Sequence, residues 1–543
     1  MEQDDGRVDD EPMRWNGWGD PEKAKELPRA VRALLPLLLG RLHKPSVRVE
    51  LADVRIETSR LTPADLSTFR GIVGDGHVDS TVEARVRHSG GRSTRDLLRL
   101  RRADQPAPDA VLRPATHEEV RAVLVAATEH DIAVIPFGGG TSVVGALDPE
   151  RGRHRAVVSM DLRRLSGLLA LDVLSGEATL AAGTTGPMAE QLLSAQGLEL
   201  GHFPQSFRYA TIGGFAAARS SGQNSAGHGR FDAMVTGIRV ATPTGDLDLG
   251  RSPGSAAGPD LIRVFLGSEG IFGVITEVKV RVHPVPAHRV FEAWSVPDFA
   301  VGADALRRIA QRGGGPTVIR LSDEAETAVS LAQVGRIGKA MAKGASIVTV
   351  YEGDDVEHRR ARAAEVLRAA GGSPSGESGA EEWLRGRFDG PYLRDSLLDA
   401  GVFCETLETA TTWTRLPAVR AAVTVALREG FTEAGARSYV MCHISHVYPT
   451  GASLYFTVLA GVRGDQSTVW DVVKARVNDA IIAAGGTISH HHAVGRDHAP
   501  WLAQEIGDTG VRILTAIKRE LDPQGILNPG AVIVDDARAE RAD

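Results

Sequence analysis

The chain has 543 residues, which is too long for one compact core, so two or three domains are expected. Hydrophobic residues make up 42% of it and charged residues 24%, as in ordinary globular proteins. The formal net charge of −7 argues against the basic surface that attracts a phosphate backbone, so no nucleic-acid partner is expected.

The cysteine content and the N-terminal region indicate the compartment. Cys404 and Cys442 are the two cysteines, too few for a disulfide framework and not spaced as a zinc site. The most apolar N-terminal run, residues 33–39, is far shorter than the ~20 residues of a membrane span. The first thirty residues are acidic and polar, unlike a secretory signal. We expect a cytoplasmic protein whose membrane association, if it has one, comes from a surface patch.

The N-terminal region combines a polar start with helical segments. Residues 14–19 read Arg-Trp-Asn-Gly-Trp-Gly, and we expect these tryptophans to dock on the folded body because disordered tails rarely carry them. Apolar residues recur at helical spacing over residues 28–42. Thr62 followed by Pro63 is typical of a helix start.

Residues 108–286 alternate short β-branched runs with helical ones, as in an α/β domain. Thr116 and Glu119 are spaced to begin a helix that runs to about His130. Strands are predicted at residues 132–136, 157–162, 177–182, 237–242 and 273–280.

Beyond residue 287 longer helical segments are interspersed with strands, and a Gly/Ser-rich loop is predicted at residues 371–379. Residues 466–528 are mainly helical. The predicted fold class is α+β, in four parts: an N-terminal arm (1–105), a cofactor domain (106–286), a cap domain for the substrate (287–465) and a C-terminal helical return (466–543).

A glycine-rich loop follows the predicted strand at 132–136. Residues 136–142 read Pro-Phe-Gly-Gly-Gly-Thr-Ser. Three glycines let a backbone pass close to a pyrophosphate, and Thr141 and Ser142 add hydroxyl donors. An isolated loop of this kind is equally well a plain turn. It has neither the GxGxxG spacing of a nicotinamide site nor the Gly-Lys-Ser/Thr ending of a nucleoside-triphosphate loop.

Two further glycine motifs follow in the same region. Thr211-Ile212-Gly213-Gly214 precedes Arg219-Ser220-Ser221-Gly222, and residues 267–277 read Gly-Ser-Glu-Gly-Ile-Phe-Gly-Val-Ile-Thr-Glu. Each motif alone is weak. In this order and spacing the three loops resemble the FAD domain of the vanillyl-alcohol-oxidase family, also called the PCMH type. That resemblance implies FAD as the cofactor and assigns it the following contacts: Pro136, Gly138, Gly139, Gly140, Thr141, Ser142, Gln205, Ser206, Thr211, Gly213, Gly214, Ser221, Gly222, Glu269, Gly270, Val274 and Ile275.

Further motifs are similar to one lineage of that family, the alkyldihydroxyacetonephosphate synthases. They are residues 14–19, 201–202, 318–321, 392–395 and 489–492, so the resemblance covers nearly the whole chain. It implies non-covalent FAD and a reaction with no net redox change. In that reaction the acyl chain of acyl-dihydroxyacetone phosphate is exchanged for a long-chain alcohol, which makes an ether lipid. A lipid-like substrate in turn calls for an apolar tunnel in the cap, with which Met341 and its apolar neighbours are compatible.

Three consecutive histidines, His490, His491 and His492, are the sharpest polar feature. Successive residues on a helix point roughly 100° apart, so two of the three at most could share a metal ion, and we assign no metal ligand. One buried and two solvated histidines would be the structural interpretation. The resemblance implies instead that these imidazoles line the active site and handle protons.

The resemblance also assigns a catalytic role to Tyr455 and substrate binding to Arg320 and Arg394. A phenol can move a proton on a substrate carbon if neighbouring cations lower its pKa. A guanidinium is a natural partner for phosphate because it offers a planar fork of donors. A packed tyrosine and surface salt bridges are the structural alternatives.

Two departures from the synthase pattern leave the substrate open. Gln205 stands where an acidic residue is expected, and His228 replaces a tyrosine. An alternative is an FAD-dependent 2-hydroxy-acid dehydrogenase or oxidase, since residues 522–530 also match that group. Such enzymes carry a pair of metal-binding histidines, of which His446 would be the first but Tyr455 occupies the second position. A flavin-binding scaffold without turnover is a third reading. A homodimer is the expected assembly.

Overall fold

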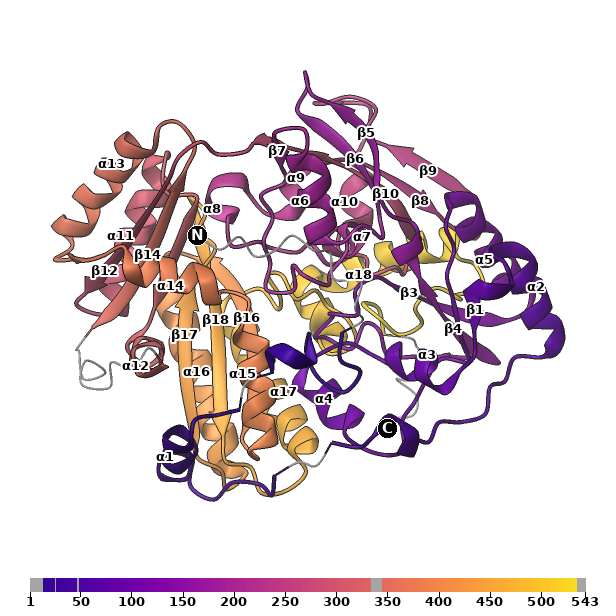
Figure 1. Ribbon diagram of the computed structural model, residues 1–543, viewed down its shortest axis with the longest axis horizontal. Coiled ribbons are helices and arrows are strands. Elements are labelled where there is room, and N and C mark those ends of the chain that lie inside the picture. Colours follow the sequence, from indigo (N-terminus) through magenta and orange to yellow (C-terminus); the bar gives the residue numbers. More distant parts are fainter. Residues whose placement is uncertain (1–12, 25, 46–47, 334–343, 535–543) are drawn as a thin grey trace.

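The computed structural model describes residues 13–24, 26–45, 48–333 and 344–534. Two sheets lie on one side of the molecule and a third, larger sheet on the other, with the C-terminal helices returning between and behind them (Figure 1). Met341 lies outside the described residues. Within the described residues no helix is both long and apolar enough to cross a membrane.

The first sheet contains the strand that leads into the glycine-rich loop. Its strand order is β1-β2-β4-β3, in which β2, β4 and β3 run parallel and β1 is antiparallel. The central strands are buried on both faces, which explains their continuous apolar runs. Its strands are β1 (Val78–Asp79), β2 (Ala110–Leu112), β3 (Ile132–Phe137) and β4 (Ala156–Asp161).

Helix α5 (His117–Glu129) covers this sheet and begins where the sequence predicts. The Thr116 side chain accepts a hydrogen bond from Glu119 N at 3.1 Å, so the helix has a side-chain N-cap. Its buried face of Val120, Val123 and Leu124 packs into the core of the sheet.

The second sheet is antiparallel, in the order β5-β6-β10-β8-β9. Short helices connect its strands and carry the second glycine motif. The strands are β5 (Leu168–Asp172), β6 (Glu177–Ala181), β8 (Val235–Ala241), β9 (Asp246–Leu249) and β10 (Val274–Arg281). The helices are α6 (Gly186–Ser194), α7 (Ile212–Ala218), α8 (Ser225–His228), α9 (Phe231–Met234) and α10 (Ile262–Phe265).

The third sheet has seven antiparallel strands in the order β15-β12-β14-β13-β17-β18-β16. Helices pack against it around the largest hydrophobic core of the described chain. The strands are β12 (Arg289–Val296), β13 (Val318–Ser322), β14 (Ala345–Glu352), β15 (Ser373–Gly376), β16 (Phe403–Thr412), β17 (Ser438–Ile444) and β18 (Gly451–Ala460). The helices include α11 (Phe299–Arg312), α12 (Glu324–Gln333), α13 (Val356–Ala369), α14 (Ser378–Gly386), α15 (Gly390–Asp399) and α16 (Leu416–Glu433).

One local prediction is wrong. The Gly/Ser-rich segment at 371–379 is not all loop, because Ser373–Gly376 pairs with β12 as an edge strand. An edge position tolerates this composition since one side of the strand needs no partner and all of its residues are exposed. The domain boundaries predicted at residues 106, 287 and 466 stay a prediction.

The N-terminal arm docks as predicted. Trp15 and Trp18 are buried, and Trp18 N donates to Asp395 Oδ2 of α15 at 2.8 Å. The arm also contains α1 (Arg29–Leu39), α2 (Pro63–Val73), α3 (Val82–Arg87) and α4 (Thr94–Leu100). At the other end α17 (Gln466–Ala484) and α18 (Leu502–Leu521) lead the chain back to the first two sheets.

Candidate active site

The glycine-rich loop leaves the carboxyl end of β3 and runs against the segment before α7 with no room for side chains. A Cβ on Gly139 would lie 1.9 Å from the backbone oxygen of Tyr209, and one on Gly138 would lie 2.4 Å from Thr211 Oγ1. Gly140 has a φ of +70°, a left-handed conformation that favours glycine. Glycine is therefore required at these positions by contact and by backbone conformation.

The second glycine motif begins α7, where Thr211 is the N-cap and accepts from Gly214 N at 3.2 Å. Gly213 packs on Ala182 of the second sheet, which leaves no space for a Cβ. Ser221 and Gly222 follow α7, and Ser221 Oγ lies 3.1 Å from His446 Nδ1. This segment thus connects the cofactor loops with a histidine that lies between two strands of the third sheet.

The third motif is tied to the C-terminal return. Glu269 Oε2 accepts from Gly495 N at 2.7 Å and from Val494 N at 3.0 Å. Burial raises the pKa of Glu269 to about 7, although these two N–H groups favour its carboxylate. The Asn528 side chain donates to Glu269 O at 2.8 Å, so the C-terminal segment closes over this loop.

The packing and the hydroxyl groups of these loops are compatible with a dinucleotide cofactor. Close-packed glycines expose backbone groups, and the hydroxyls of Ser142 and Ser268 are buried without a hydrogen-bond partner among the described residues. Buried hydroxyls are normally satisfied, so they are available to a bound phosphate or ribityl chain. The residues that would hold FAD are those of the 136–142 loop, the start of α7 and Glu269–Gly270.

The side chains of four predicted cofactor contacts do not lie in the glycine loops. The side chains of Val274 and Ile275 are buried in hydrophobic cores, so only their backbone groups remain for a cofactor. Gln205 is exposed, with its Oε1 facing Gly390 of the third-sheet region, and Ser206 follows it in a turn.

The three consecutive histidines are fixed by one buried carboxylate. Glu408 of β16 accepts hydrogen bonds from the backbone N–H groups of His490, His491 and His492 at 2.7, 3.0 and 2.9 Å, and from Ser489 Oγ at 2.9 Å. Burial alone would raise the pKa of Glu408, but the imidazoles and these N–H groups hold it well below its usual range. An ionised carboxylate therefore organises the histidine loop.

A fourth histidine and a second tyrosine join this cluster. His446, between β17 and β18, lies with its ring centroid 5.1 Å from those of His490 and His491. Tyr448 Oη is 2.6 Å from His490 Nε2. Burial and the neighbouring imidazoles lower the pKa values of His446 and His490, and that of His492 falls to about 3. These rings are neutral at ordinary pH.

Tyr455 of β18 lies against the same histidines. Its ring centroid is 4.7 Å from that of His443, 5.9 Å from that of His491 and 5.7 Å from that of His492. A phenol would move a proton more readily if neighbouring cations lowered its pKa. Burial instead raises the pKa of Tyr455 to about 12, and the opposing effect of Arg394 is smaller, so this condition is not met.

The two predicted arginines differ in how fully they are engaged. Arg320 Nη2 on β13 lies 2.8 Å from Glu326 Oε1 and 2.9 Å from His443 Nδ1. Arg394 on α15 is 8% exposed and donates from Nη1 to Arg92 O at 2.6 Å. Its Nε and Nη2 make no hydrogen bond with the described residues, although Asp395 Oδ1 is 3.7 Å away. Arg394 therefore keeps two guanidinium nitrogens without a hydrogen-bond acceptor among the described residues, whereas Arg320 is paired with Glu326.

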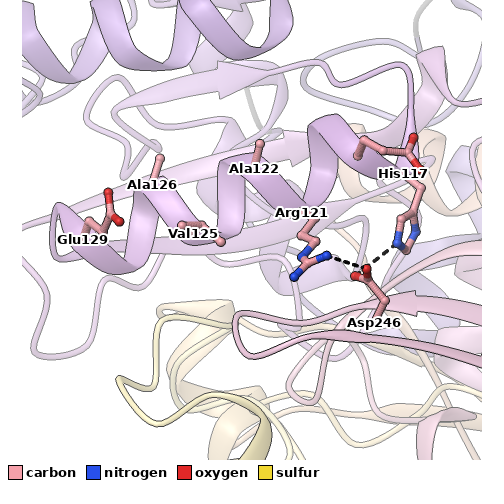
Figure 2. A pocket seen from close by; sticks show the side chains of 8 residues that line it. His117, Arg121, Ala122, Val125, Ala126, Glu129 and Asp246 are labelled. Atoms are coloured by element: carbon pink, nitrogen blue, oxygen red, sulfur yellow. Dashed lines mark hydrogen bonds and ion pairs between the residues drawn. The ribbon is translucent and has the colours of Figure 1, made fainter.

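A surface pocket along α5 is not part of this constellation. Figure 2 shows His117 and Arg121 turned toward Asp246, at 3.2 and 2.9 Å. None of the predicted site residues lines it. The interactions are a local ion-pair group between α5 and β9.

Several residues of the cluster were missed by sequence reasoning. Glu408, His443 and Tyr448 carry no motif, and His446 was considered only as half of a metal pair. The one local signal is that Glu405 and Glu408 occur in a strand of apolar residues and threonines, and both are buried. A buried carboxylate in a strand needs a partner, which here is the histidine loop.

Known proteins match this arrangement over nearly its whole length. An FAD binding domain model matches residues 108–248, and a model for the C-terminal domain of FAD linked oxidases matches residues 285–532. The chain is 30% identical to the alkyldihydroxyacetonephosphate synthase of Trypanosoma brucei brucei over 96% of its own length and 92% of the relative's. The chain belongs to the alkyldihydroxyacetonephosphate synthase family.

Solved structures agree with this assignment. A crystallised alkyldihydroxyacetonephosphate synthase superimposes with a TM-score of 0.81 at 27% identity, covering 95% of this chain and 98% of that one. A p-cresol methylhydroxylase at 17% identity shares the fold, with a TM-score of 0.67. These matches confirm the α+β class, the PCMH-type FAD-binding architecture and FAD as the cofactor of this alkyldihydroxyacetonephosphate synthase family member.

Relatives of the dehydrogenase type are more distant. The glycolate oxidase subunit GlcD of Bacillus subtilis is 25% identical over 80% of this chain. In this synthase family member, Tyr455 stands at the position where the second histidine of the dehydrogenase metal pair was expected.

Proposed function

We propose that this protein exchanges the acyl chain of acyl-dihydroxyacetone phosphate for a long-chain alcohol. The bond between a carbon of dihydroxyacetone phosphate and the ester oxygen breaks, and the fatty acid leaves as a carboxylate. The alcohol oxygen bonds to the same carbon and its proton is released. No electrons are gained or lost overall, and bound FAD would supply a redox-active, electrophilic ring.

Arg394 is proposed to bind the phosphate. It is buried, and two of its guanidinium nitrogens make no hydrogen bond with described residues, so a phosphate oxygen would satisfy donors that now lack an acceptor. Arg320 is proposed as the second cation. It contacts His443, which stacks on Tyr455, and it is paired with Glu326 at 2.8 Å.

The titration behaviour of the cluster suggests which groups move protons. Burial lowers the pKa values of these imidazoles and so keeps them neutral, and a neutral imidazole can accept a hydrogen bond from the alcohol. Tyr455 has a raised pKa and stays protonated, so we assign it as the hydrogen-bond and proton donor at the substrate carbon or its oxygen. His490, His491 and His492 are the proposed acceptors.

The observation that carries this proposal is the packing of Tyr455 against the histidine loop, with an unsatisfied Arg394 in the same protein interior. Arg394 favours the ionised form of Tyr455, although burial has the larger effect on its pKa. A buried cation, a phenol and neutral imidazoles suit a phosphate-bearing substrate whose reaction needs a proton donor and acceptors.

The test is to mix the protein anaerobically with labelled acyl-dihydroxyacetone phosphate and, separately, with D-2-hydroxy acids. We expect fatty-acid release with the first substrate and ether product after a long-chain alcohol is added. Tyr455→Phe should keep the flavin spectrum and lose exchange. Full flavin reduction by a hydroxy acid without fatty-acid release would refute the proposal and establish the dehydrogenase alternative.

A peripheral membrane contact is also proposed, at α1. Leu37 and Leu38 are 74% and 58% exposed on this helix, while Leu35 and Leu39 anchor its other face in a small core. Arg29 and Arg32 lie on the same short helix, a combination typical of helices that lie in a lipid interface. A non-covalently bound FAD and a homodimer stay predictions.

A further inference from the structure

His446, His490 and His491 bring one imidazole nitrogen each to within 4.8 Å of one another. Two of them are consecutive residues of the loop after α17, and the third comes from the segment between β17 and β18. At most two of the three consecutive histidines can share one ion. His490 and His491 supply two nitrogens, and His446 supplies the third from another segment of the chain. His492 is not one of the three, and its Nδ1 lies 3.9 Å from Glu408 Oε1.

Each of the first two rings is oriented by a partner on its other nitrogen. His446 Nδ1 is engaged by Ser225 Oγ at 2.6 Å and Ser221 Oγ at 3.1 Å, and His490 Nε2 by Tyr448 Oη at 2.6 Å. This arrangement is typical of metal-binding histidines, whose outer nitrogen is held by a hydrogen bond that fixes the tautomer and the ring orientation.

The two nitrogens of the consecutive histidines already point at each other. His490 Nδ1 and His491 Nδ1 are 2.9 Å apart, which for two neutral imidazoles means one shared proton. An ion that replaces this proton would bond to both lone pairs. Neighbouring ligands of a tetrahedral ion lie roughly 3.3 Å apart for metal–nitrogen bonds of about 2.0 Å, so a small outward shift is enough.

One carboxylate faces the cluster, and one guanidinium opposes a cation there. The Glu408 carboxylate is 3.6 Å from His491 Nδ1. Arg230 forms an ion pair with Asp232 at 3.3 Å, and the same carboxylate also pairs with Arg219 and Arg263. Metal sites commonly use a buried carboxylate to hold the histidine ligands in position through hydrogen bonds, and Glu408 holds the loop of His490 and His491 in this way.

We propose that His446, His490 and His491 bind one divalent transition-metal ion through three imidazole nitrogens, with zinc as the suitable probe. A fourth coordination position remains for water or substrate. Because His490 and His491 are also the proposed proton acceptors, an occupied site should inhibit the exchange reaction. This inhibitory consequence rests on the proposed function, whereas the binding itself does not.

A second group, Glu199, His228 and Glu352, also brings ligand atoms within 4.8 Å. It is the weaker candidate because Glu352 is committed to Arg289 at 2.7 Å and to Asn224 at 3.2 Å. It nevertheless provides the matched control, since His228 is another partly buried histidine outside the proposed active site.

The experiment is equilibrium dialysis of the chelator-treated flavoprotein against zinc, with bound metal counted by mass spectrometry. We expect one zinc ion per chain, affinity weakened more than about tenfold in His446→Ala and His446→Gln, and affinity unchanged in His228→Gln. Flavin absorbance and circular dichroism check that each variant is folded. Unchanged binding in both His446 variants, or loss of binding in His228→Gln, would overturn the proposed site.

Activity is measured separately on the same samples. Zinc at saturating concentration should abolish exchange, and a chelator should restore it. Stoichiometric binding at His446 without inhibition would leave the metal site standing and refute the proton-acceptor role of His490 and His491. Failure of exchange in the metal-free enzyme would refute the proposed function alone.

Discussion

Glu408→Gln is expected to destabilise the protein because one buried carboxylate organises the histidine loop. Oε1 accepts from His491 N, His492 N and Ser489 Oγ, while Oε2 accepts from His490 N. A glutamine has a single acceptor oxygen. If that oxygen replaces Oε1, the amide NH2 faces the N–H of His490, and one buried donor loses its acceptor.

The magnitude follows from these four hydrogen bonds. An unsatisfied buried N–H costs about 1–3 kcal/mol, and three hydrogen bonds that change from charged to neutral acceptors lose roughly 1 kcal/mol each. Removing a buried charge returns part of this loss. We expect the free energy of unfolding to fall by about 2–4 kcal/mol.

The effect depends on pH with a definite sign. The pKa of Glu408 is lowered in the folded state, so its contribution is present above the unfolded value of 4.5 and is lost as pH falls toward the folded pKa. The difference between wild type and Glu408→Gln should therefore be constant from about pH 7 to pH 5 and shrink below pH 4.5.

Urea titrations followed by tryptophan fluorescence measure this difference, with Glu505→Gln as the matched control. Glu505 accepts from Ile488 N at 3.0 Å and Thr487 Oγ1 at 2.8 Å in the same loop, but its side chain is exposed. The control should lose less than about 0.5 kcal/mol. Equal stability of Glu408→Gln and wild type at neutral pH would refute the claim that the carboxylate holds the loop.

Four further substitutions, one of them with a matched control, have defined outcomes. Gly139→Ala should lose bound FAD, because its Cβ would lie 1.9 Å from Tyr209 O. The control Gly245→Ala, whose Cβ would have no atom within 4 Å, should keep FAD. The ratio of flavin to protein absorbance measures both, and a full flavin content in Gly139→Ala would contradict the assigned loop. Arg394→Ala should raise KM for phosphate-bearing substrates by about 10- to 100-fold, and Arg320→Ala should also weaken them selectively; an equal loss with neutral analogues would make either arginine structural. Leu37→Glu should reduce co-sedimentation with anionic vesicles without changing exchange of short-chain substrates, and unchanged co-sedimentation would remove α1 as the contact.

The sequence by itself determined the cofactor half of the protein. The glycine loops at 136–142, 211–214 and 267–270 are each local, so their spacing along the chain indicates the fold, and steric requirements restrict those positions to glycine. Helix α5 and strands β3 and β10 were likewise predicted, since capping and buried apolar runs act over a few residues.

The resemblance also predicted Tyr455 and the consecutive histidines as site residues, but it could not predict how deeply they are buried or which groups they contact. The pKa of Tyr455 is raised rather than lowered because burial, its largest cause, is a property of the whole packed interior. The edge strand at 373–376 was missed for a related reason, since its only support is the register of β12.

Only the tertiary structure decided the cluster itself. Glu408 lies 82 residues before His490, and His446 reaches the same loop from a third segment. No local pattern links these positions, because hydrogen bonds between distant segments depend on strand register and on the path of α17. The sequence therefore determines which groups are present, while packing determines which of them are close enough to share a proton, a phosphate or a metal ion.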